Sequence, residues 1–201
     1  MTDTADHQRQ WDQKYTLGNT HADYQADNDF VKYIDCVPAS GIALDVACGT
    51  GRNSFFLAEH GLDVICMDFS AQGLKFLKQH RANQAITKKL FPVQADLTKI
   101  PLPDRCFDLV VVIRYLDRQA FPAYLQALKP GGLLFFKAFN LNHLKRKPGF
   151  NPDYLLSPGE LIQQFNGLEI LHSNDHNSMT DFESFILLRN RLTNSSVPHP
   201  V

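Results

Sequence analysis

The stretch "ALDVACGTGRNSFFLAEHG", residues 43–61, has the pattern of a buried strand, a glycine turn and the start of a helix. Gly49 and Gly51 let the backbone turn sharply and approach a ligand closely. The helix that follows presents N–H groups that have no partner inside the helix. An acid, Asp45, stands just before the turn. The charge of that acid helps to decide which ligand the turn can hold.

The rest of the chain alternates strand-like runs with helical patterns, which is typical of a parallel sheet covered by helices. The predicted strands are 42–47, 62–68, 90–96, 107–113 and 132–139, and the predicted helices are 52–60, 71–83 and 119–129. Two later runs, 167–173 and 181–189, have no helix between them, which indicates an antiparallel pair at a sheet edge. We therefore predict an α/β, doubly wound Rossmann-like fold with a seven-stranded sheet, mostly parallel with an antiparallel edge strand.

Length and composition favour one globular domain, because the chain has 201 residues, of which 44% are hydrophobic and 20% charged. We predict a single domain at 1–190, with a helical cover at 1–40 and a flexible tail at 191–201. The net charge of -1 provides no strong field for nucleic acid. A monomer or a homodimer is expected.

The expected location is the cytoplasm. The first residues contain no apolar segment of the kind found in secretory signals, and no apolar run approaches the roughly 20 residues of a membrane helix. Four cysteines are scattered without a C-x-x-C pair, which favours free thiols in a reducing compartment. We expect a soluble protein without a metal site.

Two common ligands of glycine turns fit the stretch poorly. A dinucleotide fingerprint needs a glycine or alanine where Ser54 stands, and Asp45 would repel a pyrophosphate. A P-loop would need Gly-Lys-Ser/Thr where Arg52-Asn53 stands. An acid before the turn suits a ligand that brings positive charge, such as S-adenosylmethionine with its ammonium and sulfonium groups.

Two further acids follow predicted strands. Asp68 ends the second strand, where a carboxylate can accept both hydrogen bonds of a ribose diol, and Asp96 ends the third, where it could accept an adenine amine. Both could instead cap helices, although Ser70 and Thr98 are equally able to do so. We predict that both acids contact the cofactor.

Five segments resemble the class I S-adenosylmethionine-dependent methyltransferases over about Trp11 to Arg189: "LDVACGTGR", "MDFS", "QADL", "FDLVVV" and "LKPGGLLFF". Ala47 departs from the family, which often has a glycine there. Together with "YLLSPGEL", the segment "ACGTGRNSFFLA" is most similar to the tellurite-resistance type of small methyltransferase. That type often has a glutamate where Lys137 stands. The resemblance implies S-adenosylmethionine as cofactor, bound by Asp45, Ala47, Cys48, Gly49, Gly51, Arg52, Asn53, Asp68, Phe69, Ala95, Asp96 and Leu97.

The acceptor side is predicted from the carboxyl end of the fourth strand, where Arg114 and Tyr115 follow, and from a basic, proline-broken loop at 140–154. That loop contains His143 and the run 145–147, which either is solvated or attracts an anion. We predict Arg114, Tyr115 and His143 as catalytic residues. His172 and His176 are further histidines that could accept a proton.

The predicted activity is in-line methyl transfer to a small-molecule, possibly anionic, acceptor, for which a base is optional. Nucleic acid is an unlikely partner, since the net charge is near neutral. Two alternatives stay open: an RNA methyltransferase that uses 145–147, and a module that binds S-adenosylmethionine without catalysis. Cys48 is expected to be a buried filler. Trp11 and Tyr15, four residues apart, favour a helical face packed on the core, and a lid over the cofactor stays open as the alternative.

Overall fold

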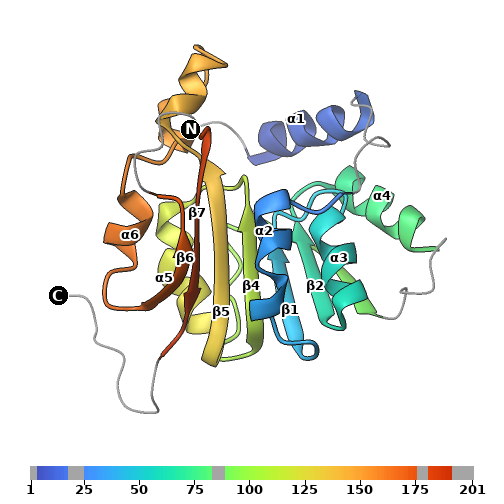
Figure 1. Cartoon of the computed structure of the whole chain (residues 1–201). Coiled ribbons are helices and arrows are strands. Elements are labelled where there is room, and N and C mark those ends of the chain that lie inside the picture. The colour runs from blue at the N-terminus through green and yellow to red at the C-terminus, as the bar shows by residue number, and fades with distance from the viewer. Residues whose placement is uncertain (1–3, 18–24, 83–88, 176–180, 192–201) are drawn as a thin grey trace. The chain divides into compact units, whose positions relative to one another are not determined.

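A computed structural model of the chain describes residues 4–17, 25–82, 89–175 and 181–191. Seven strands form a sheet in the order β3-β2-β1-β4-β5-β7-β6 (Figure 1). The predicted α/β, mostly parallel sheet is therefore confirmed. The chain divides into two compact units, Met1–Ile100 and Pro101–Val201, which are described in turn. His176 and all of the predicted tail except Arg191 lie outside the described residues.

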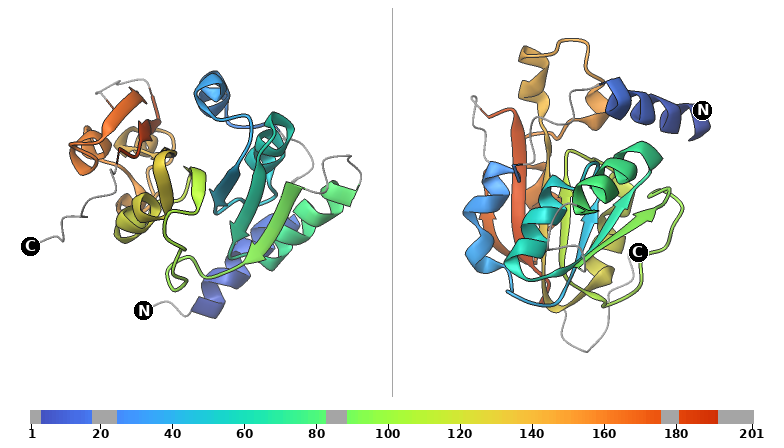
Figure 2. Two further views of the ribbon diagram at one scale, coloured as in Figure 1. Left: turned by 90° about the horizontal axis from the view of Figure 1, so that it is seen from below. Right: turned by 90° about the vertical axis from the view of Figure 1, so that its right-hand side faces the viewer.

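The first unit is a parallel three-stranded part of the sheet with its helices. Its elements are α1 (Thr4–Leu17), α2 (Asn28–Lys32), the 3-10 helix η1 (Ile34–Cys36), β1 (Ile42–Val46), α3 (Arg52–His60), β2 (Asp63–Asp68), α4 (Ala71–Ala82) and β3 (Leu90–Gln94). β1 pairs with β2, and β2 with β3, both parallel, so the three strands end at the same edge (Figure 2). The predicted helices 52–60 and 71–83 match α3 and α4 within one residue.

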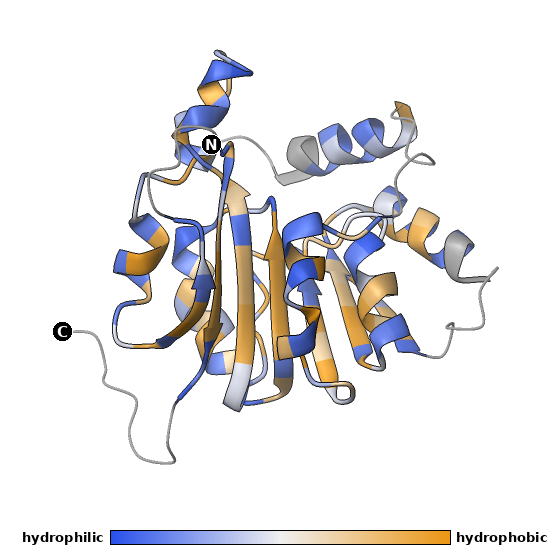
Figure 3. Cartoon of the chain, in the orientation of Figure 1, coloured by the Kyte–Doolittle hydropathy of each residue, from blue (hydrophilic) through white to orange (hydrophobic). Residues whose placement is uncertain are grey.

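The strands of this unit are apolar, whereas α1 is mainly hydrophilic (Figure 3). Leu44 on β1, Val64 on β2 and Leu90 on β3 are completely buried. The helix α1 packs against α4 at the edge where β1 and β2 end (Figure 1). The described part of the predicted 1–40 cover is thus largely helical, in α1, α2 and η1.

The second unit contains the antiparallel strands. Its elements are β4 (Phe107–Ile113), η3 (Arg118–Ala120), α5 (Phe121–Ala127), β5 (Leu128–Phe139), η4 (Leu141–Lys145), η5 (Pro152–Tyr154), α6 (Glu160–Gln164), β6 (Glu169–Ser173) and β7 (Glu183–Arg189). β4 and β5 are parallel, and β7 is antiparallel to both β5 and β6. The predicted antiparallel pair at the sheet edge is confirmed: β6 is the edge strand, and β7 lies between β6 and β5.

The predicted helix 119–129 is too long, and the predicted strand 132–139 begins too late. The helix α5 ends at Ala127, and β5 begins at Leu128. Pro130 explains the difference, because a proline disfavours helical geometry in the residue before it. The side-chain amide of Asn190 lies within 3.2–3.4 Å of the carbonyl oxygens of Leu125, Leu128 and Lys129, three groups at the helix end.

The loop predicted at 140–154 contains two short 3-10 helices instead of being wholly irregular. Each begins at an asparagine whose side-chain oxygen accepts a backbone N–H two residues later: Asn140 from Asn142 and Asn151 from Asp153, both at 3.0 Å. The short helices α2 and α6 were not predicted, since five residues leave too little periodicity to detect.

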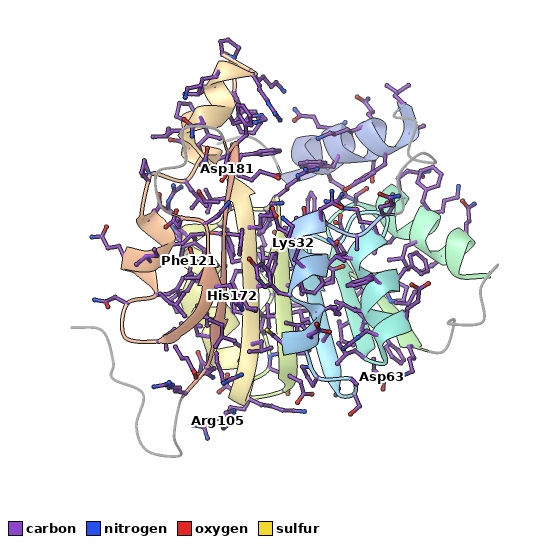
Figure 4. All side chains as sticks on the ribbon, in the orientation of Figure 1. Lys32, Asp63, Arg105, Phe121, His172 and Asp181 are labelled. Atoms are coloured by element: carbon purple, nitrogen blue, oxygen red, sulfur yellow. The ribbon has the colours of Figure 1, made fainter. Side chains whose placement is uncertain are left out.

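The core of the second unit is aromatic. Phe121, labelled in Figure 4, packs edge-on against Phe136 with ring centroids 5.0 Å apart, and its centroid lies 5.2 Å from that of Phe165. All three side chains are at most 1% exposed. None of the helices in the described ranges is both long and apolar enough to cross a bilayer, and the cytoplasmic location stays a prediction.

Candidate functional site

The turn between β1 and α3 is built from residues with left-handed backbone angles. Ala47, Gly49 and Gly51 have φ values of 54°, 58° and 86°. The Cys48 N–H donates to the Met67 carbonyl of β2 at 3.1 Å, and the Gly51 N–H donates to the Cys48 carbonyl at 2.9 Å. The positive φ of Ala47 gives a physical reason why related sequences often have glycine there, because a side chain disfavours this conformation.

Asp45 is buried beside this turn, with an exposed fraction of 1%. The hydroxyl of Ser54, in the first turns of α3, donates to Asp45 Oδ2 at 2.6 Å. Burial raises the pKa of Asp45 to about 7, the hydrogen bonds from Ser54 oppose that rise, and the charge of Asp68 adds to it. Asp45 is therefore a carboxyl group that can gain or lose a proton near neutral pH.

Asp68 holds the same turn from the end of β2. Its Oδ2 accepts the Gly49 N–H and its Oδ1 accepts the Ser70 N–H, both at 2.7 Å. Burial raises the pKa of Asp68, while these two backbone hydrogen bonds oppose the rise. Asp68 thus binds the backbone of the glycine turn, and its predicted contact with a ribose stays a prediction.

The helix α1 contacts this turn through Asp12 and Tyr15. Asp12 Oδ1 accepts the Ser70 hydroxyl at 2.5 Å and the Gln72 N–H at 3.1 Å. The Tyr15 ring lies against two glycines, since a Cβ on Gly49 would stand 2.6 Å from Tyr15 Oη and one on Gly73 would stand 3.2 Å from Tyr15 Cε2. Burial and the nearby acids raise the Tyr15 pKa.

The prediction that Trp11 and Tyr15 form one buried helical face is wrong for Trp11. Its side chain is 44% exposed, with the Lys14 ammonium 4.0 Å from its ring centroid. The two aromatic rings are still in contact, with centroids 6.1 Å apart. Tyr15 alone of the two lies against the glycine turn.

Arg52 and Asn53 connect α3 to the segment before α2. Asn53 Oδ1 accepts the Asp27 N–H at 2.9 Å, and Arg52 Nη2 lies 3.8 Å from Asp27 Oδ2. Asp27 in turn caps α2 by accepting the Asp29 N–H at 3.1 Å. The structure gives both predicted cofactor residues a bracing role, and their contact with the cofactor stays a prediction.

Cys48 is buried, and burial with the charges of Asp45 and Asp68 raises its thiol pKa. The thiol therefore stays protonated at neutral pH, in keeping with its interpretation as a filler.

Asp96 follows β3 and caps a local turn. Its carboxylate accepts the Thr98 hydroxyl at 2.7 Å and the Thr98 N–H at 3.1 Å, and the Lys99 ammonium lies 2.8 Å away. These contacts hold the Asp96 pKa below its ordinary value. The capping alternative is realised here, and the adenine contact stays a prediction. The remaining predicted cofactor residues, Phe69, Ala95 and Leu97, are half-buried.

The donor set around the turn fits a cationic ligand. Asp12, Asp45 and Asp68 bring three carboxyl groups to one turn, and Arg52, the cation that acts on Asp45, is itself paired with Asp27. Ammonium and sulfonium groups would be stabilised beside these carboxylates, whereas a pyrophosphate would be repelled. The residues present therefore fit S-adenosylmethionine.

In the second unit, Arg114 and Lys137 share one acid. Arg114 Nε lies 2.6 Å from Glu183 Oε1, and Lys137 Nζ lies 3.0 Å from Glu183 Oε2. Lys137 is 4% exposed, whereas the Arg114 side chain is 46% exposed and its guanidinium lies 5.5 Å from the centroid of the Phe139 ring. Although burial opposes its charge, these two cations hold the Glu183 pKa below its ordinary value.

His143 lies between two aromatic rings in the second unit. Its ring centroid is 4.1 Å from that of Phe139 and 5.0 Å from that of Phe150. Its Nδ1 atom is buried and has no hydrogen-bond partner within the described part of the chain. Arg114, Phe139 and His143 therefore form a connected group, and Tyr115, half-buried, follows Arg114 directly.

The basic run 145–147 is exposed, and two of its members lie over aromatic rings. Arg146 lies 3.4 Å from the Phe182 ring centroid, and Lys147 lies 5.4 Å from that of Phe150. These contacts favour a surface role. His172, labelled in Figure 4, is exposed on β6.

Comparison with known proteins shows which family this chain resembles. Residues 43–132, from β1 through the start of β5, match the family described as "Methyltransferase domain". This match covers a little under half of the chain and supports its resemblance to the class I S-adenosylmethionine-dependent methyltransferases. S-adenosylmethionine is the cofactor of such domains, in agreement with the donor set at the glycine turn.

Two relatives show how far the similarity extends. The Bacillus subtilis protein YqeM is 33% identical over 127 residues, which cover 58% of this chain and 49% of that protein. The demethylmenaquinone methyltransferase of Renibacterium salmoninarum is 34% identical over 115 residues, which cover 55% of this chain and 46% of that protein. The chain thus spans about half the length of these relatives.

Solved structures share the fold of this methyltransferase domain. An S-adenosylmethionine-dependent methyltransferase from Mesorhizobium loti has a TM-score of 0.66 at 16% identity, covering 83% of this chain and 100% of that one. TehB from Haemophilus influenzae has a TM-score of 0.65 at 19% identity, covering 89% of this chain and 66% of that one. At these identities the likeness shows the fold alone.

Sequence reasoning missed Ser54, Ser70 and the contacts of Asp12. In the sequence, Ser54 only disfavours a dinucleotide fingerprint, although it stands in the helix that follows Asp45 and can turn its hydroxyl back toward the strand end. Asp12 carries no comparable signal, because its partners Ser70 and Gln72 are about 60 residues away in the sequence.

Proposed function

We propose that this protein transfers a methyl group from S-adenosylmethionine to a small-molecule acceptor. The observation that carries the proposal is the pair of buried acids, Asp45 and Asp68, held at the glycine turn of a methyltransferase domain. When bound, the cofactor supplies an electrophilic methyl group on a positively charged sulfur. The residues of the chain supply binding, orientation and the exclusion of water.

In the first unit, the proposed tasks divide among three groups. Asp45 accepts hydrogen bonds from the cationic amino-acid part of the cofactor, and Asp68 accepts hydrogen bonds from its ribose. Gly49 and Gly51 let the backbone approach it. Tyr15 and Asp12 on α1 keep water away from this side of the turn, because Tyr15 packs against Gly49 and Gly73 and Asp12 accepts hydrogen bonds from Ser70 and Gln72.

In the second unit, we assign the acceptor to Arg114, Tyr115 and His143. Arg114 and the buried Lys137 bring two cations close together at Glu183, and such a pair of cations favours an anionic acceptor group. His143 can take a proton through an imidazole nitrogen if the acceptor is a hydroxyl or an amine. A small-molecule acceptor is supported by the name of the R. salmoninarum relative, a demethylmenaquinone methyltransferase.

Incubation with radiolabelled S-adenosylmethionine and a panel of small metabolites tests the proposal. Label should move to at least one acceptor, and Asp68→Ala should reduce both donor binding and transfer. Asp63→Ala is the matched control, because Asp63 is exposed at the opposite end of the same strand (Figure 4). Saturable donor binding without transfer to any acceptor would favour the non-catalytic module, and transfer to RNA would favour the nucleic-acid alternative.

A further inference from the structure

Ser54 lies beside Asp45, one of the proposed cofactor residues, and its hydrogen bond to that acid gives it more than a packing role. It is completely buried, and its hydroxyl donates to Asp45 at 2.6 Å. Its backbone N–H also contributes a hydrogen bond to the same carboxyl group. A carboxyl group that is 1% exposed needs such donors to stay ionised, because water cannot supply them.

The charged and titratable groups around Asp45 come from several elements. Asp68 at the end of β2, Cys48 in the turn and Tyr15 on α1 each interact with it, and ionisation of any of them would oppose a charge on Asp45. Arg52 on α3 acts in the opposite direction, but it is also paired with Asp27. Within this unit, Ser54 provides the hydrogen bonds that most favour ionised Asp45.

We propose that Ser54 is a positioning residue that favours the ionised form of Asp45 and keeps it aimed at the turn, so that the site binds the methyl donor more tightly than the product, whose sulfur is uncharged. This inference rests on the proposed function. In methyl transfer the carbon–sulfur bond breaks and its electron pair stays on sulfur, so the sulfonium becomes a neutral thioether. The acceptor atom forms the new bond to carbon, and a protic acceptor releases its proton to a base or to water.

The loss of that ligand charge changes the interaction with a buried carboxylate. Asp45 attracts both the ammonium and the sulfonium of the donor. When the sulfur becomes neutral, the sulfonium part of that attraction is lost and the ammonium part remains, so the product is held more weakly. The preference requires the charged form of Asp45. Since burial raises the pKa of Asp45 to about 7, the carboxylate fraction and the donor preference should both rise with pH through that value.

Calorimetric titration with S-adenosylmethionine and S-adenosylhomocysteine tests the proposal through binding alone. The range should run from about pH 6 to about pH 7.5, where an α-amino group stays largely protonated. In the wild type, the ratio of product to donor dissociation constants should rise about five- to tenfold over this range. Asp45→Asn, which keeps the shape without the charge, should give a low and flat ratio.

Ser54→Ala provides the decisive profile. Loss of the hydroxyl should move the rise in the ratio to higher pH, because the hydrogen bond no longer favours the carboxylate. A merely structural role would lower both affinities equally at every pH. Thermal melts establish that each variant is folded, and Asp63→Asn should behave as the wild type.

A flat wild-type ratio, or a pH-dependent ratio that survives in Asp45→Asn, would overturn the inference while leaving the proposed function intact. Failure of the wild type to bind either ligand would instead contradict the proposed function, and this inference with it.

Discussion

The Tyr15 hydroxyl lies so close to Gly49 that a Cβ on that glycine would stand 2.6 Å from its oxygen. The backbone of Gly49 also has a left-handed conformation, with a φ of 58°. Two separate physical reasons therefore require glycine here: the backbone conformation and the approach of α1. Because Tyr15 also lies against Gly73 of α4, one tyrosine joins α1 to both sides of the cofactor turn.

Gly49→Ala should destabilise the protein by about 2–4 kcal/mol and weaken donor binding, because it adds backbone strain and displaces Tyr15. Tyr15→Phe should restore part of the stability in the double variant, since it removes the atom nearest the new Cβ but not the strain. Gly149→Ala is the control, because its Cβ position has open space around it among the described residues beyond its two chain neighbours, and its φ is not left-handed. Urea unfolding measures all four proteins, and a neutral Gly49→Ala would contradict this account.

Asp68→Ala should weaken S-adenosylmethionine binding by about 2–4 kcal/mol, because it removes predicted ribose hydrogen bonds and releases the Gly49 and Ser70 N–H groups. Calorimetry measures the affinity. Asp63→Ala should leave it unchanged. Equal affinities for wild type and Asp68→Ala would remove Asp68 from the cofactor site.

Asp45, Asp68 and Asp96 show what can be predicted from the sequence. Their places at strand ends follow from hydrophobic patterning, and the glycine turn follows from local backbone chemistry, so the sequence predicts both the fold and the turn. The partner of each acid was not. Asp45 accepts a hydrogen bond from Ser54 because α3 runs back alongside the end of β1. Asp96 accepts a hydrogen bond from Thr98, two residues later. Composition alone does not decide whether such an acid caps a turn or contacts a ligand.

The second unit shows a different limit. Lys137 and Glu183 are 46 residues apart in sequence, and they meet because β7 pairs antiparallel with β5, a register that no local pattern specifies. The partner of Arg114 could not be predicted from the sequence for the same reason. Long-range pairing therefore determines the charges that act on the predicted acceptor residues.

Asp45→Asn should change how stability depends on pH. The unfolded chain ionises Asp45 near 4 and the folded protein near 7, so between these values folding takes up a proton and wild-type stability falls as pH rises. Relative to Asp45→Asn, the wild type should lose about 2–3 kcal/mol between about pH 5 and about pH 8. Denaturant unfolding of both proteins at each pH checks the difference. Parallel stability curves would contradict the raised pKa of the buried Asp45 carboxyl group.

Glu183→Gln should destabilise the second unit by about 1–3 kcal/mol at neutral pH, because Lys137 would stay buried without its carboxylate partner. Since the pKa of Glu183 is lowered in the folded protein, its stabilisation is present above the ordinary glutamate pKa and is lost as pH falls. The difference between wild type and variant should therefore shrink in acid. Asp104→Asn, at an exposed position of the same unit, is the control in the same unfolding assay. A difference that persists unchanged in acid would argue against the ion pair.

Arg114→Ala should reduce turnover of an anionic acceptor at least tenfold while leaving donor affinity nearly unchanged, because its side chain is 46% exposed and belongs to the acceptor group of the second unit. Arg105→Ala is a close control: Arg105 is also exposed (Figure 4), and its φ of 51° resembles the 61° of Arg114, so the two substitutions change the backbone alike. Replacing the run 145–147 should change acceptor affinity only modestly and mainly at low salt, since these cations are exposed and screened. Turnover and donor calorimetry, measured in parallel, separate the two sites. Wild-type turnover in Arg114→Ala would refute an anion site at Arg114 and would shift the acceptor assignment toward an uncharged molecule handled by Tyr115 and His143.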